Sequence, residues 1–103
     1  VCGTAVEYST TTTIKVDVIK GWTLDWPRYE TEDAVFGVGS ARPLEDATRI
    51  AYRELIRWME ADYSFDKWDA YMMLSQCGIV RLGNFVDPKY TVAAGIRKKF
   101  LAE

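Results

Sequence analysis

A thiol and a carboxylate lie close together at the start of the chain, in the run VCGTAVE. Cys2 precedes Gly3, whose missing side chain lets backbone N–H groups come close to a ligand. Glu7 could accept a proton or hold an ammonia-like group. The alternative for Cys2 is a small buried apolar residue, and for Glu7 a salt bridge at the surface or at a strand end. Cys2 and Glu7 are therefore the candidate catalytic residues, with Cys2 as a nucleophile or as a pocket wall.

The remaining composition limits the chemistry of the chain. There is no histidine, so an imidazole base or ligand cannot come from these residues. The two cysteines lack CxxC spacing, so no zinc or other metal site is expected within the chain. A cationic or histidine neighbour that would activate the Cys2 thiol is not visible in the sequence. We expect Cys2 and Cys77 to be free thiols in a reducing compartment, the cytoplasm.

Length and composition fit one globular domain of 103 residues, with 49% hydrophobic and 27% charged residues. A net charge of −2 and the lack of a basic stripe argue against a nucleic-acid partner. No apolar run approaches the roughly 20 residues of a membrane span. The aromatic content is 14%, which indicates either a bulky core or rings that pack against a partner.

The first half of the chain predicts strands. Residues 14–19 place Ile14, Val16 and Val18 on one face, which is the period of a half-buried strand. Residues 22–26 alternate again and predict a second extended piece before Pro27. Residues 34–40 predict another strand, with glycines at positions 37 and 39 on one face. Glycines on one face indicate that something packs very close there. The following helix is the simplest candidate, and a substrate or a neighbouring subunit is the alternative.

Two helices and a hairpin follow. An apolar stripe at steps of three and four residues predicts a long helix over about 43–62, with Pro43 at its start. A second helix is expected from a Ser64 cap to Gly78. Its packed side is expected to hold Phe65, Trp68, Met72 and Ser75, with Tyr71 and Leu74 broadening that face. Residues 79–86 and 91–96 predict a hairpin, and the tail from 97 is expected to be loose unless Phe100 and Leu101 dock. Strands and helices come in blocks, so the expected fold is α+β: a mainly antiparallel sheet with two helices on one face.

One further motif, Trp26-Pro27-Arg28-Tyr29-Glu30-Thr31, carries charged side chains on both sides of a tyrosine. Arg28 and Glu30 could form a bidentate ion pair that fixes this loop, a role that we favour over catalysis. Asp87 before Pro88 is interpreted as a turn residue. Cys77, at a helix end, is interpreted as a core residue.

Taken in order, these segments resemble the C-terminal portion of the acetamidase/formamidase family of amidohydrolases across nearly the whole chain. The resemblance rests on the following stretches: CGTAVE, VIKG, WPRYET, EDATRIA, DAYMMLS and FVDPK. It implies hydrolysis of a small amide, such as formamide or acetamide, to a carboxylate and ammonia, with Cys2 lining the amide pocket. The competing interpretation is a non-catalytic interaction or assembly domain that keeps the family fold.

The resemblance also implies that residues 1–103 are one part of a larger protein. The family pattern places a Gly-Asp-Gly-Glu turn before the cysteine and histidines earlier still, and both are absent from a sequence that begins at Val1. Engineered boundaries, proteolysis or self-cleavage would each explain this start. We therefore expect activity only beside the N-terminal part of the same protein or a companion chain. That part is also where a divalent metal would bind, and by resemblance the assembly is a homo-oligomer.

Overall fold

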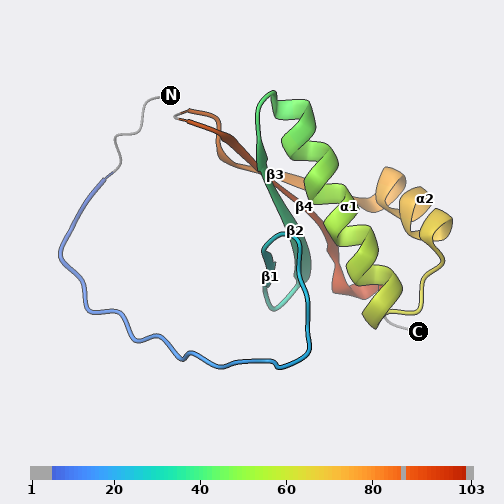
Figure 1. Cartoon of the computed structure of the whole chain (residues 1–103), viewed down its shortest axis with the longest axis horizontal. Helices are drawn as coiled ribbons and strands as arrows, with labels where there is room; N and C mark the ends of the chain where they lie inside the picture. The colour runs from blue at the N-terminus through green and yellow to red at the C-terminus, as the bar shows by residue number, and fades with distance from the viewer. Residues whose placement is uncertain (1–5, 87, 102–103) are drawn as a thin grey trace.

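The computed structural model describes residues 6–86 and 88–101. Four antiparallel strands form one sheet in the order β1-β2-β4-β3. The bounds of the elements are β1 Arg28–Glu30, β2 Ala34–Ala41, α1 Leu44–Asp62, α2 Lys67–Cys77, β3 Ile79–Asn84, β4 Tyr90–Arg97 and a short 3-10 helix, Lys98–Phe100. Figure 1 shows α1 running along the sheet with α2 beside it. The predicted α+β class, with both helices on one face, is confirmed.

The long helix follows from its sequence. Pro43 precedes the first turn, and Glu45 and Asp46 lie where the helix dipole favours negative charge. The apolar stripe faces the sheet, so Ala51, Leu55 and Met59 are fully buried. They pack against residues of β2 and β4 in one core cluster, which includes Val35, Val92, Ala94 and Ile96. The predicted helix over 43–62 is thus confirmed.

The two glycines of β2 allow α1 to lie unusually close to the sheet. A Cβ placed on Gly37 would be 2.7 Å from the carbonyl oxygen of Ala51 and 2.8 Å from the amide nitrogen of Leu55. Both atoms belong to the helix backbone and cannot move aside cheaply. The prediction that a helix packs on the glycine face is confirmed.

The opposite face of the sheet holds a smaller cluster built around Phe36. Ala34, Phe36 and Ala93 are buried there, with Val38 and Ile79 packed against them. The Tyr29 ring stacks on Phe36 with 4.6 Å between ring centroids. On the neighbouring strand, Gly95 leaves the space that the Phe36 ring fills, because a Cβ at position 95 would clash with this ring.

Residues 6–27 differ from the prediction. The strand expected over 14–19 does not form, and the second extended piece expected over 22–26 is not part of the sheet and bends at residues 25 and 26. Ile14, Val16 and Val18 are 76%, 84% and 75% exposed, and Figure 1 shows this segment as an open loop away from the sheet. The periodicity was correct for a strand, but a strand needs a hydrogen-bonding neighbour, and the described chain places none beside these residues. The actual first strand, Arg28–Glu30, falls within the WPRYET motif.

The second helix also differs in detail. Asp66, rather than Ser64, caps it by accepting a hydrogen bond from the Trp68 amide at 2.8 Å. Ala70 and Leu74 are its buried residues, whereas Trp68 and Met72 of the predicted packed side are exposed. Its end at Gly78 is as predicted, and the tail docks through Leu101, which is buried. None of the described helices is long and apolar enough to cross a membrane.

We predict that Gly37→Ala lowers the free energy of unfolding by about 1–3 kcal/mol, because the added methyl group overpacks the contact with the α1 backbone. Gly83→Ala is the matched control, since its nearest neighbour would be a Thr91 methyl group at 3.4 Å. Urea unfolding of both variants measures the difference. Equal stability of the two variants would contradict the close approach of α1.

Candidate functional site

Of the two predicted catalytic residues, the structure describes only Glu7. Cys2 lies outside the described residues, as does Asp87 of the predicted turn. Glu7 is exposed on the extended segment that precedes the sheet. Cys77 is a half-buried free thiol at the end of α2. The structure therefore leaves the roles of Cys2 and Glu7 as predictions.

The most developed polar constellation lies instead between β1 and α1, and centres on Arg28. Its Nε donates a hydrogen bond of 2.7 Å to Oε1 of Glu54. The two side chains are 9% and 2% exposed, so this is a buried ion pair. The predicted pair between Arg28 and Glu30 is wrong, because Glu30 is paired with Lys98 at 2.5 Å. Arg28 instead points to the helix face of the sheet, where Glu54 lies.

Two indole rings enclose the Arg28 guanidinium. Its central carbon lies 5.7 Å from the ring centroid of Trp22 and 5.2 Å from that of Trp58. Trp58 is itself oriented by a 2.8 Å hydrogen bond from Nε1 to Asp62. Arginine over an aromatic face is favourable, more so where water is excluded. The rings thus stabilise a cation that would otherwise be costly to bury.

Arg28 keeps one unused donor. Its Nη1 is buried and has no hydrogen-bond partner among residues 6–86 and 88–101. Nearby, Arg57 approaches the second Glu54 oxygen at 4.0 Å and forms an ion pair with Asp25. The carboxylates of Glu54 and Asp25 are both engaged in ion pairs with arginine side chains. The chemistry of this cluster is therefore positional: it fixes the WPRYET motif to α1.

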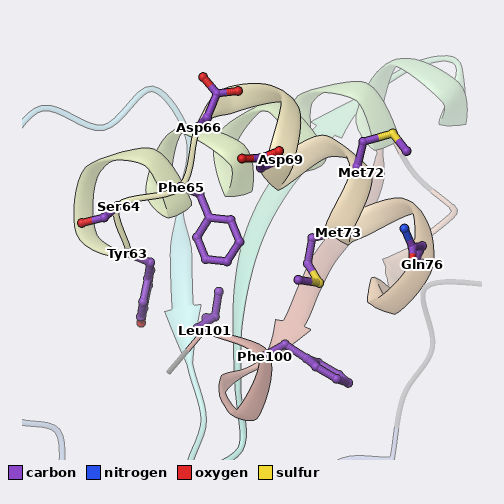
Figure 2. A pocket seen from close by; sticks show the side chains of 10 residues that line it. All are labelled: Tyr63, Ser64, Phe65, Asp66, Asp69, Met72, Met73, Gln76, Phe100 and Leu101. Carbon is purple, nitrogen blue, oxygen red and sulfur yellow. The ribbon is translucent and has the colours of Figure 1, made fainter. Parts of the chain in front are cut away.

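A groove of about 480 Å³ lies at the end of the molecule formed by α2 and the C-terminal tail. Figure 2 shows Phe65 and Met73 turned toward Leu101, with Asp66 directed away from them. Phe65 and Met73 pack against the core cluster, and Asp66 is occupied in capping α2. No group of three or more metal-ligating side chains occurs in the described part of the chain. The groove is lined by polar and apolar side chains alike and holds no assembled hydrolytic centre.

One side chain of this groove, Tyr63, has a perturbed acidity. Burial is the first cause that raises its pKa above the ordinary value of 10.0, and the negative charges of Glu30 and Asp62 raise it further. Lys98 acts in the opposite direction. All three raising causes disfavour the phenolate, so Tyr63 is a neutral phenol at physiological pH.

Sequence reasoning missed Glu54, Trp22 and Trp58 as members of a site. A signal for Glu54 was present: it lies three residues after Ala51 and four before Trp58, which places a carboxylate next to the apolar stripe of α1. A charged residue at such a position requires a buried partner. The identity of that partner could not be read from spacing, because Arg28 is 26 residues away.

We predict that Glu54→Gln lowers the free energy of unfolding by about 3–5 kcal/mol, because it leaves the buried Arg28 cation without its counter-charge. The double variant Arg28→Met with Glu54→Leu is expected to recover most of this loss, since apolar residues of similar size remove both charges. The exposed pair Asp46–Arg49 is the control, and Asp46→Asn should cost less than about 1 kcal/mol. Calorimetry that finds the single and double variants equally unstable would contradict the assignment.

A second prediction concerns alkaline pH. The folded-state pKa of Tyr63 is raised, so its contribution to stability is present below pH 10.0 and is lost as the pH rises through the folded value. We therefore expect Tyr63→Phe to make the decline of melting temperature above pH 10 less steep than in the parent chain. Tyr8→Phe, on the exposed N-terminal segment, is the control. Parallel pH profiles for the parent and Tyr63→Phe would show that this phenol does not contribute.

The chain is similar to an acetamidase from Yersinia enterocolitica, with a TM-score of 0.81 and 65% identity over 82% of this chain and 26% of that one. A predicted acetamidase/formamidase from Thermoanaerobacter tengcongensis has the same fold, with a TM-score of 0.72 at 23% identity over 81% of this chain and 28% of its own. An acetamidase from Bacillus halodurans gives 0.67 at 19% identity, over 75% and 26% of the two chains.

The matches cover only about a quarter of the solved relatives, as the shares of 26% and 28% show. No family model matches the chain. No curated protein sequence matches it either.

Proposed function

Because the chain matches the acetamidase/formamidase family in sequence and in fold over the segment it spans, we propose that it is the C-terminal portion of an amidohydrolase of that family. The observation that carries this proposal is the 65% identity to the Yersinia acetamidase over 82% of the chain. The proposed reaction is hydrolysis of a small aliphatic amide, formamide or acetamide, to a carboxylate and ammonia.

The proposed reaction needs an attacking nucleophile or activated water, donors for the oxyanion and a proton for the leaving amine. We assign to this chain the wall of the amide pocket, with Cys2 beside the backbone N–H groups at Gly3. Glu7 is the proposed proton acceptor or ammonia-binding group. The remaining groups, including any divalent metal, are assigned to the part of the protein outside this chain.

The proposed partner is the N-terminal part of the same protein or a companion chain. One feature supports it. Trp68, Tyr71 and Met72 are 66%, 54% and 55% exposed on the outer side of α2, and clustered exposed rings are typical of a contact surface. We further propose that the whole protein is a homo-oligomer located in the cytoplasm.

The alternative is a non-catalytic interaction or assembly domain that keeps the family fold. The exposed aromatic residues of α2 favour it as well, because they require a partner but no reaction. The two proposals differ in one measurable respect, the release of ammonia from an amide once the family's remaining segment is supplied.

We predict that a chimaera in which this chain replaces the matching segment of the Yersinia acetamidase releases ammonia from acetamide or formamide, whereas the 103-residue chain alone does not. In the chimaera, Glu7→Gln is expected to lower kcat by about 100-fold or more, as for loss of a general base. Cys2→Ala and Cys2→Ser should both lower turnover if the thiol lines the pocket. Ammonia production measures each effect.

The control is Cys77→Ser, a thiol at the far end of α2 that should leave turnover unchanged. Unchanged turnover in both Cys2 variants would remove Cys2 from the mechanism. Unchanged turnover in Glu7→Gln would likewise remove Glu7. A folded chimaera without amidase activity would favour the assembly domain.

A further inference from the structure

A groove of about 500 Å³ lies between α1 and α2, here called the α1–α2 groove. The two helices lie side by side (Figure 1). Tyr52 and Ile56 of α1 line the groove, are half-buried and pack against the core cluster. Tyr71 of α2 lines the other side and is 54% exposed. A smaller hollow shares both tyrosines and continues to Leu74, so the groove offers a long apolar surface that the described chain leaves uncovered.

Cationic side chains gather along the same groove. Arg49, Arg53 and Arg57 follow one another at intervals of four residues, which places them in one row on α1. Lys67, at the start of α2, adds a fourth cation, and Glu60 is the carboxylate of the lining. All five side chains are exposed. The chain as a whole carries a net charge of −2, so the groove has the opposite charge to the rest of the molecule.

Arg53, in the middle of the row, is not neutralised. Arg49 is paired with Asp46 and Arg57 with Asp25, whereas residues 6–86 and 88–101 provide no carboxylate partner for Arg53. Like charges four residues apart destabilise a helix, and Arg53 has an arginine four residues away in both directions. A carboxylate from outside the described residues would turn this unfavourable row into a favourable contact.

Charge separates the candidate occupants of the groove. A contact between two copies of residues 1–103 about a two-fold axis would place the cationic row against itself, which is unfavourable. The chain covers 26% of the Yersinia acetamidase, and under the proposed function the remainder of such a protein lies outside residues 1–103. A segment of that remainder can bring both a carboxylate and apolar side chains to the groove.

We propose that the α1–α2 groove binds a segment of the remaining part of the same protein, with a carboxylate of that segment opposite Arg53 and apolar side chains against Tyr52 and Tyr71. The inference rests on the proposed function insofar as it assigns the chain to a larger protein of the acetamidase/formamidase family. It does not depend on the reaction that this protein catalyses.

Charge reversal at Arg53 tests the contact. In the chimaera with the Yersinia acetamidase, Arg53→Glu should lower the melting temperature by about 3 °C or more, because two carboxylates then face each other. In the 103-residue chain, the same substitution should leave the melting temperature unchanged or slightly raised, because it removes the repulsion within α1. Arg53→Lys keeps the charge and should retain the melting temperature of the chimaera. Lys89→Glu, at an exposed cation between β3 and β4, is the control and should affect both proteins equally.

Nitration of Tyr71 reports on the groove without a change of charge. Tetranitromethane should modify Tyr71 readily in the 103-residue chain and slowly in the chimaera, as measured by peptide mass spectrometry. Arg53→Glu should restore the reactivity of Tyr71 in the chimaera, whereas Lys89→Glu should not.

Three results would overturn the proposal: an equal effect of Arg53→Glu on the chain and on the chimaera, equal nitration of Tyr71 in both, or a 103-residue chain that dimerises and protects Tyr71 by itself. The last result would assign the groove to a second copy. Ammonia release tests the reaction separately. A folded chimaera that protects Tyr71 but releases no ammonia would support this inference and contradict the amidase proposal.

Discussion

The close contact between α1 and β2 is the constraint on which the other features depend. Because Gly37 has no side chain, the helix backbone lies directly against the strand. Arg28 is the register partner of Gly37 on the neighbouring strand, and the Glu54 carbonyl carbon would be 3.3 Å from a Cβ at position 37. The missing side chain therefore brings Glu54 within reach of Arg28. The close packing of α1 on Gly37 and the ion pair between Arg28 and Glu54 therefore depend on the same contact between the helix and the sheet.

The elements that the sequence predicted well are those whose signals are local. The long helix, the strand over 34–40 with its glycine face, and the hairpin each depend on periodicity and turn residues within one segment. Residues 14–19 carry an equally clear period, but a strand exists only in a sheet, and alternation does not supply its neighbour. Residues 14–19 therefore have the alternation of a strand but do not form one in the described chain.

Long-range relations were the part that sequence reasoning could not supply. Arg28 has a carboxylate two residues away, yet its partner lies on a helix far along the chain. In α2, Leu74 of the predicted packed face is buried, but Ala70 is buried with it, whereas Trp68 and Met72 are exposed. The spacing of apolar residues shows which side chains of α2 lie on a common face. It does not show which of those faces packs against α1. The site prediction failed to include Glu54 for the same reason, and Cys2 falls outside the described residues.

The Phe36 ring over Gly95 has a consequence for how this segment can diverge. The ring occupies the volume that any side chain at position 95 would need, and Tyr29 covers its other side. A larger residue at 95 is tolerable only after Phe36 has been replaced by something smaller, and a smaller residue at 36 leaves a hole until 95 enlarges. The two positions form an epistatic pair, so the order in which substitutions arise restricts the mutational paths open to this face of the sheet.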